Sequence, residues 1–257
     1  MKKYLLFFAI LIAYGCTESD LTFNPVVANS DGAPELVQTF GGSKNDVAKS
    51  VVATLDGGFA VLGYTQSMDG DVIGKTTENY DFWVLKFNSD ALLEWNKTYG
   101  GTGDDRGNSL IETSDGGFVL LGYSDSVDGD VTTNNGNRDF WVVKIDAFGA
   151  LTWQKSFGYA GADEGMSIIE TSDNHFILSG VLDVTASGGE GNFGRLSTRH
   201  AGGDYWSIKI TQTGDVVWSR FYGGSFTDNP AGVVENASNN LITVGGSDSN
   251  DVDITNN

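Results

Sequence analysis

The chain has 257 residues, of which 40% are hydrophobic and 12% aromatic, enough to bury a large core and to exclude a disordered protein. Its 34 acidic and 15 basic side chains give a net charge of −19, so nucleic acids and anionic lipid headgroups are excluded as direct partners of the folded surface. A single cysteine, Cys16, excludes an intramolecular disulfide. The 35 glycines and 3 prolines are typical of many short strands joined by tight turns.

Residues 1–15 have the pattern of a secretory signal peptide. Two lysines precede an apolar stretch, residues 4–12, which is too short to cross a membrane as a helix. Gly15 directly before Cys16 resembles a bacterial lipobox, and this resemblance implies that the Cys16 thiol is diacylated and becomes the first mature residue. The alternative is an ordinary secretory signal with an incidental cysteine, because Tyr14 is not the small residue usual in that motif.

Residues 16–35 form a polar stretch without periodicity, which predicts a flexible acidic tether. The Thr-Glu-Ser-Asp run at 17–20 is similar to the surface-export signal of Bacteroidota lipoproteins. The resemblance implies an outer-membrane lipoprotein of the cell envelope, exposed at the cell surface and attached to the membrane by its lipid alone.

Residues 36–257 repeat one block of about 58 residues three times and begin it a fourth time. The first two blocks share Gly-Gly-Phe (57–59 and 116–118), Asp-Gly-Asp-Val (69–72 and 128–131) and Asp-Phe-Trp-Val (81–84 and 139–142). The third block is looser and keeps Asp-Tyr-Trp at 204–206. Repeats of this length are typical of propellers and solenoids rather than of domains with a single core.

Each block predicts four strands. In the second block these are residues 109–113, 118–123, 140–145 and 151–157, with glycine-containing turns after the first and third strands and a longer loop after the second. In the first block, residues 82–87 are largely apolar on both sides, which indicates a sheet covered on both faces. We therefore expect an all-β fold, a β-propeller of four-stranded blades rather than an open sandwich.

The motifs G-G-x-x-x-D, D-G-G-F, L-G-Y, D-G-D-V and D-F-W-V resemble the β-propeller repeats, sometimes called SBBP-type, of envelope and secreted proteins of Bacteroidota. The resemblance covers residues 36–257 and implies an envelope lipoprotein with a propeller domain. The recurring tryptophans are expected to pack between blades rather than to stack on sugars, because they return once per block. They are Trp83, Trp141 and Trp206, and Trp95, Trp153 and Trp218.

The repeat is incomplete at both ends of the sequence. Residues 36–42 match the fourth strand of a block, and residues 248–252 match the Asp-Gly-Asp-Val loop with no third strand after them. A blade that stops after two strands exposes an edge that proteins normally cover. We therefore expect three blades and part of a fourth, from a longer propeller truncated at its C-terminus. An oligomer is expected only if the chain truly ends at Asn257, since the ring must then close between chains.

Aspartates gather in the loops between the second and third strands. Asp69, Asp71, Asp128 and Asp130 could bind Ca²⁺ together with turn carbonyls, because a hard cation prefers several oxygen ligands on flexible loops. The alternative is that the aspartates accept backbone N–H bonds where the chain turns. This second role is favoured for the set that recurs in every block, Asp46, Asp105, Asp163 and Asp228.

The third block carries an insertion between residues 187 and 201. It adds Phe193, Arg195, Arg199 and His200 to an otherwise acidic rim. Long loops on a rigid scaffold are where binding residues concentrate, so we predict a contact loop for a carboxylated or hydroxylated ligand such as a glycan. The alternative is a tolerated insertion whose arginines pair with neighbouring aspartates.

The sequence contains no evident catalytic constellation. His175 occupies a turn position that is glycine in the first two blocks, and His200 has no identifiable partner. Glu112, Glu170 and Glu235 recur on the expected innermost strands, where they could line a channel. A repeated glutamate, however, lacks the two unlike environments that glycoside hydrolysis requires.

Taken with the resemblance, these patterns predict a lipid-anchored, non-enzymatic envelope propeller that serves as a binding or interaction scaffold for a glycan or protein ligand, in glycan capture or adhesion. The alternative is part of a glycan-active enzyme of the glycoside hydrolase type, with its catalytic portion outside this sequence. The fold cannot decide between them, because propellers host many unrelated functions.

Overall fold

A computed structural model describes residues 37–191 and 200–254. The chain divides into two compact units, residues 1–40 and 41–257, and the strands found in the described residues lie in the second unit. The described residues are all-β apart from one four-residue helix, α1 (Val184–Ser187). The predicted all-β class is therefore confirmed.

The strands form four antiparallel sheets in chain order. Sheet 1 contains β1 (Asp46–Ala53), β2 (Phe59–Thr65), β3 (Asp81–Phe87) and β4 (Leu93–Tyr99). Sheet 2 contains β5 (Asp105–Glu112), β6 (Phe118–Ser124), β7 (Asp139–Ile145) and β8 (Leu151–Phe157). Sheet 3 contains β9 (Glu164–Glu170), β10 (Phe176–Asp183), β11 (Gly203–Ile210) and β12 (Val216–Tyr222), with α1 after β10. Sheet 4 contains β13 (Asp228–Glu235) and β14 (Leu241–Ser247).

The first strand of sheet 2 begins four residues earlier than its apolar pattern predicts. Strand β5 starts at Asp105, which pairs with Ser124, and the ladder shifts between Gly107 and Ser109. Asn108 is thus a bulge, an extra residue that interrupts the alternation of inward and outward side chains. The first strands of the other sheets have the same irregularity, so the bulge belongs to the repeat.

A recurring glycine faces each bulge. At Gly122 a Cβ atom would lie 1.9 Å from the carbonyl oxygen of Arg106, and at Gly63 it would lie 1.7 Å from that of Val47. Any side chain would therefore collide with the backbone of the neighbouring strand. This close approach explains why the glycine of the Leu-Gly-Tyr motif returns in every block.

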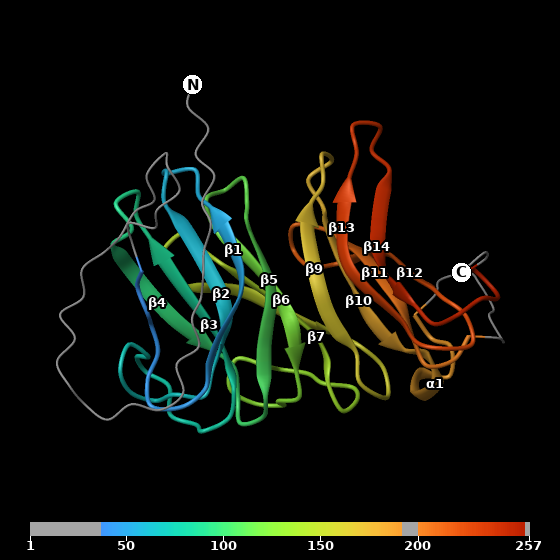
Figure 1. Cartoon of the computed structure of the whole chain (residues 1–257), viewed down its shortest axis with the longest axis horizontal. Coiled ribbons are helices and arrows are strands. Elements are labelled where there is room, and N and C mark those ends of the chain that lie inside the picture. Colours follow the sequence, from blue (N-terminus) through green and yellow to red (C-terminus); the bar gives the residue numbers. More distant parts are fainter. Residues whose placement is uncertain (1–36, 192–199, 255–257) are drawn as a thin grey trace. The chain divides into compact units, whose positions relative to one another are not determined.

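The four sheets are packed against one another in series. The first strands contact each other in the order β1, β5, β9 and β13, and Figure 1 shows them side by side. This arrangement is propeller-like. Three serine hydroxyls join the strands by accepting a backbone N–H from the next sheet, and the pairs are Ser50 with Leu110 at 3.4 Å, Ser109 with Ile168 at 3.3 Å and Ser167 with Val233 at 3.4 Å.

The hydrophobic core lies between the sheets. All seven residues of β3 and of β7 are buried, which confirms that these sheets are covered on both faces. The ring of Trp141 lies 4.7 Å from that of Phe82 in the preceding sheet, and Trp206 lies 4.8 Å from Phe140. These tryptophans pack between sheets as predicted, and they bury large apolar areas at each junction.

Within the part of the chain described by the structure, α1 is the only helix, and no helix there has the length and apolarity needed to cross a membrane.

Candidate functional site

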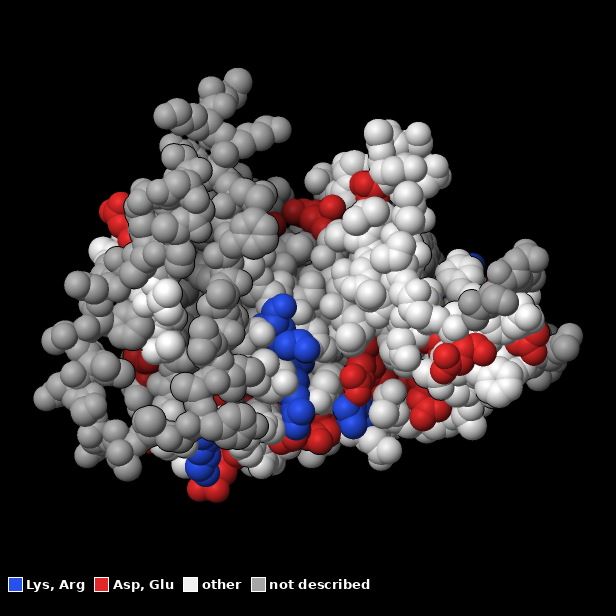
Figure 2. Space-filling model, in the orientation of Figure 1, with Lys and Arg blue, Asp and Glu red and all other residues white. Residues whose placement is uncertain are grey.

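The longer loops lie on one side of the sheets, along the lower edge of Figure 1 together with α1. The loops after the second strands contact the loops that lead into the first strands, as in the 2.9 Å hydrogen bond from Asp71 N–H to the Gly41 carbonyl. Figure 2 shows acidic side chains beside the basic ones along the lower part of this face. Ion pairs formed by residues of these loops include Asp104 with Arg106 at 2.7 Å and Glu78 with Lys44 at 3.0 Å.

The aspartate at the start of each block organises this side of the molecule. Its carboxylate accepts the backbone N–H of the residue four positions earlier, at 2.7 Å from Gly101 to Asp105 and at 2.8 Å from Gly42 to Asp46. Asp163 and Asp228 do the same with Tyr159 and Gly224. The turn-capping role favoured for Asp46, Asp105, Asp163 and Asp228 is therefore confirmed.

The aspartates of the Asp-Gly-Asp loops accept hydrogen bonds from other backbone N–H groups of the same turns. Asp69 accepts the Ser43 N–H at 2.8 Å, and Asp128 accepts the Thr102 N–H at 2.7 Å. The second aspartates, Asp71 and Asp130, accept the N–H groups of Gly41 at 3.0 Å and Gly100 at 3.1 Å.

The four aspartates proposed for Ca²⁺ thus lie in two separate loops, each with a structural task. The residues that the structure describes contain no group of three or more His, Cys, Asp or Glu side chains placed to hold a metal ion.

A second set of aspartates lies at the junctions between sheets. Asp81 opens β3, and it lies across Gly100 from Asp105 of the next sheet. A Cβ atom on Gly100 would lie 2.9 Å from the Asp81 Oδ1 atom and 2.6 Å from the Asp105 Oδ2 atom. Gly223 separates Asp204 and Asp228 in the same way. Two buried carboxyl groups therefore face one another at a junction, with only a glycine between them.

Burial raises the pKa of three of the aspartates at the junctions. It raises the pKa of Asp105 to about 7, and the charge of Asp81 adds to the effect. Burial likewise raises the pKa of Asp163 to about 7, with Asp139 contributing, and that of Asp204 to about 8, with Asp228 contributing. Desolvation disfavours the ionised carboxylate, and a nearby like charge disfavours it further.

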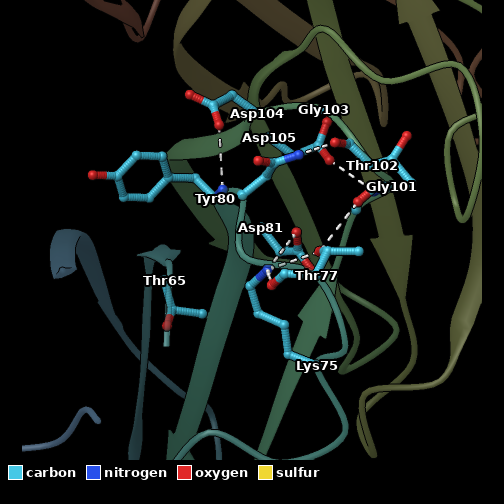
Figure 3. Close-up of polar contacts among 12 residues, drawn as sticks. Thr65, Lys75, Thr77, Tyr80, Asp81, Gly101, Thr102, Gly103, Asp104 and Asp105 are labelled. Atoms are coloured by element: carbon cyan, nitrogen blue, oxygen red, sulfur yellow. Dashed lines mark hydrogen bonds and ion pairs between the residues drawn. The ribbon is translucent and has the colours of Figure 1, made fainter. Parts of the chain in front are cut away.

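In each of sheets 1 to 3, a different group forms an ion pair or a hydrogen bond with the aspartate near the start of the third strand. In sheet 1 the buried ammonium of Lys75 lies 3.1 Å from Asp81 Oδ1 and donates to the Thr77 carbonyl at 2.7 Å, as Figure 3 shows. In sheet 2 the Asn135 N–H donates to Asp139 at 2.8 Å. Lys75 was not among the residues predicted from the sequence, although a lysine in this loop of the first block, absent from the second, was the available signal.

In sheet 3 the compensating group is His200. Its Nδ1 atom hydrogen-bonds Asp204, its Nε2 atom lies 3.6 Å from Asp253, and its ring packs edge-on against Phe221 at 4.9 Å. The His200 side chain is only 3% exposed. His200 therefore has a partner, contrary to expectation, and it faces the interior rather than a ligand at the surface.

The other predicted contact residues, Phe193, Arg195 and Arg199, lie outside the described residues, as do Cys16, the signal peptide and residues 16–35.

The recurring glutamates reach the preceding sheet. Glu112 accepts the Leu55 N–H at 2.8 Å and Glu235 accepts the Ser172 N–H at 2.7 Å, and Glu170 does the same with Ser114 at 3.3 Å. These carboxylates hold turns of the preceding sheet, a structural role that was not predicted from the sequence. His175 is half-buried in its turn, with Nδ1 2.9 Å from the Asp173 carbonyl oxygen.

Two surface hollows occur at sheet 3, where the sequence departs from the repeat. One of about 400 Å³ is lined by Val181, Asp183, Ala186 and Gly203, close to α1. The other, of about 170 Å³, lies between sheets 2 and 3 and is lined by residues including Ser156, Tyr159 and Ser219. The loop from β10 to β11 adjoins both, because Ala186 lines the first hollow and Gly191 accepts from Trp206, a lining residue of the second, at 3.2 Å.

A comparison of the chain with protein-family models finds no match, and a search among curated proteins finds none either.

Proposed function

We propose that this chain is a β-propeller of the bacterial cell envelope, anchored by a lipid on Cys16, which serves as a non-enzymatic scaffold for binding a glycan. The observation that carries the proposal is the position of the two hollows. Both lie at the third sheet, beside the loop that breaks the repeat. Binding residues concentrate where a rigid scaffold carries an exceptional loop.

The chemistry of the acidic groups supports a scaffold over a hydrolase. A glycoside hydrolase needs two accessible carboxyl groups in unlike environments. The described carboxyl groups with strongly raised pKa, Asp81, Asp105, Asp163 and Asp204, are buried at sheet junctions. Among the described residues that line the larger hollow, Asp183 is the one acid, and it caps α1 by accepting the Ala186 N–H at 2.9 Å.

Binding can be tested with the full chain by affinity electrophoresis in gels that contain neutral polysaccharides, and by a glycan array. We expect retention by at least one glycan. Ala186→Trp should abolish it by filling the larger hollow, while Val127→Trp, an exposed position in the corresponding loop of sheet 2, should leave it unchanged. Absence of retention in every gel and on the array would contradict the scaffold proposal.

Anchoring can be tested separately in a bacterial host. The wild-type chain should incorporate an alkyne-labelled fatty acid and sediment with membranes. Cys16→Ser should lose the label and become soluble. A Cys16→Ser chain that still sediments with membranes would refute the lipid anchor without affecting the proposal on glycans.

A further inference from the structure

The first two sheets each bring a tyrosine and an arginine into contact near the start of the third strand. In sheet 1 the rings of Tyr64 and Tyr80 pack edge-on at 5.2 Å, and the guanidinium of Arg106, which comes from sheet 2, lies 4.2 Å from the centre of the Tyr80 ring. In sheet 2 the guanidinium of Arg138 lies 4.8 Å from the centre of the Tyr123 ring. The negative face of the ring attracts the planar cation in both places.

Sheet 3 has much smaller residues at the same positions. The strand register places Val181 where sheet 2 has Tyr123, and Gly203 stands where sheet 2 has Arg138. A Cβ atom on Gly203 would lie 2.6 Å from the Cγ1 atom of Val181, so the two positions face each other as the tyrosine and the arginine do. Both residues line the hollow of about 400 Å³. The hollow therefore lies where the preceding sheet has a tyrosine and an arginine.

The wall of this hollow combines an apolar floor with two polar groups. Val181 and Ala186 supply aliphatic surface, and Asp183 and Thr185 supply a carboxylate and a hydroxyl. The carboxylate accepts the Ala186 N–H at 2.9 Å, and the hydroxyl accepts the Gly202 N–H at 2.6 Å. Each keeps further hydrogen-bonding capacity, because the carboxylate has other lone pairs and the hydroxyl has its proton. The wall can therefore bind the apolar face of a ring together with polar groups at its edge.

The charge at the hollow favours a cation over an anion. Among the described residues that line it, Asp183 is the one charged residue, and none is basic. Burial raises the pKa of nearby Asp163 to about 7, and the charges of Asp139 and Asp183 add to the effect. A positive group in the hollow would interact favourably with Asp183, whereas an anion would be repelled.

We propose that the larger hollow is a subsite for one amino sugar residue, with the sugar ring against Val181 and Ala186 and its ammonium group paired with Asp183. The proposal rests on the glycan-binding function above and names the ligand class and the position. The volume of about 400 Å³ lies within the roughly 300–1,000 Å³ typical of small-molecule sites. A protonated amino sugar unites a flat apolar face with a positive charge, the two properties that the tyrosine and the arginine have in sheet 2.

The test uses the full chain and saturation-transfer NMR titrations with glucosamine, glucose and glucuronic acid at pH 6, where the amine carries its proton. The three sugars share one ring configuration and differ in charge. We expect glucosamine to bind about tenfold more tightly than glucose, because hydrogen bonds to charged groups are the stronger ones, and glucuronic acid to bind least. The order of the three affinities reports the charge that the hollow selects.

Asp183→Asn is the first variant. Asparagine caps a helix as well as aspartate does, so the melting temperature should not fall, while glucosamine should bind no more tightly than glucose. Asp125→Asn changes the aspartate at the corresponding position of sheet 2, and this matched control should bind as the wild type does.

The double variant Val181→Tyr with Gly203→Arg restores the residues that sheet 2 uses and fills the hollow, so it should bind none of the three sugars. Asp183→Asn decides the matter if the double variant disturbs the fold. Absence of glucosamine binding overturns the proposal, as does equal affinity for glucosamine and glucose, or glucosamine affinity unchanged in Asp183→Asn. Retention of the same chain in polysaccharide gels or on the array would then show that the scaffold function holds with another ligand or position.

Discussion

The Glu112 carboxylate accepts the backbone N–H of Leu55 at 2.8 Å, so the first strand of sheet 2 holds the β1–β2 turn of sheet 1. A second hydrogen bond joins the same two sheets with donor and acceptor exchanged, because the Ser50 hydroxyl of sheet 1 accepts the N–H of Leu110 of sheet 2 at 3.4 Å. Each junction is thus joined by two polar contacts of opposite direction in addition to its apolar core.

Removal of the Glu112 side chain should weaken one junction. Glu112→Ala leaves the Leu55 N–H to water, and we expect the free energy of unfolding to fall by about 0.5–1.5 kcal/mol, the usual worth of a partly exposed hydrogen bond. Urea denaturation measures the change. Glu78→Ala, which removes only the exposed pair with Lys44, is the control and should change stability by less than about 0.5 kcal/mol. Equal effects of the two variants would contradict a role for Glu112 in the junction.

The junction acids predict that stability falls as pH rises. The folded-state pKa values of Asp105 and Asp163 are raised to about 7 and that of Asp204 to about 8, whereas unfolded aspartate has a pKa of about 3.9. Between the unfolded and the folded pKa values, the folded chain binds more protons than the unfolded chain. The stability that this provides falls progressively as pH rises, and it is lost completely above the folded-state pKa values. Denaturation midpoints in urea should decrease from pH 5 to pH 9.

Asp105→Asn separates this effect from the general repulsion of a chain with net charge −19. The amide is neutral at every pH, so the slope of stability against pH should be shallower in the variant than in the wild type. A wild-type chain that becomes more stable from pH 5 to pH 9 would show that the junction acids are ionised in the fold.

Loss of the buried ammonium at the first junction should be costly and dependent on pH. Lys75→Met leaves Asp81 buried without its partner, and breaking a buried ion pair costs about 3–5 kcal/mol. The loss should be greatest at pH 8. It should shrink at pH 5, because the pKa of Asp81 is already raised to about 6 by burial and the carboxyl then takes up a proton.

The double variant Lys75→Met with Asp81→Asn should recover part of the stability at pH 8, since neither charge then remains. Lys44→Met removes an exposed lysine and should have little effect at either pH. A loss in Lys75→Met that is the same at pH 5 and pH 8 would argue against an ionised Asp81 as the cause.

The Asp-Gly-Asp loops predict a stability that is independent of calcium. Asp69, Asp71, Asp128 and Asp130 accept backbone N–H groups, so their role in the fold requires no ion. The melting temperature should be the same after dialysis against a chelator and after addition of millimolar Ca²⁺. A rise of several degrees with Ca²⁺, together with ion retained in mass spectrometry and lost in Asp128→Asn, would establish the calcium site instead.

The sequence predicted the strand order and the burial of both faces because the repeat presents the same pattern several times. It misplaced the start of β5, since the bulge at Asn108 breaks the alternation on which that prediction depended. The partners of Lys75 and His200 could not be predicted, because they depend on the path of loops that differ between blocks.

Some contacts between sheets were available in the sequence. Ser50, Ser109 and Ser167 occupy the same position in three blocks, and the fourth block has Gly232 there. A hydroxyl that returns at one position of a first strand is a signal for a contact between sheets. Ser219, which stands where the first two blocks have Asn96 and Gln154, was also visible as a departure from the repeat. Its partners, Trp206 and the Gly191 carbonyl, could be named only from the structure.

The glycine opposite each bulge also bears on how such blocks can be recognised in other sequences. The residue after it changes from Tyr64 and Tyr123 to Val181 and Gly246, while Gly63, Gly122, Gly180 and Gly245 all remain. The position after the glycine therefore accepts side chains of very different size, whereas a Cβ atom about 2 Å from a carbonyl oxygen cannot be accommodated at the glycine itself. A search profile for distant copies of this block should therefore give its greatest weight to that one glycine, ahead of the more conspicuous tryptophans.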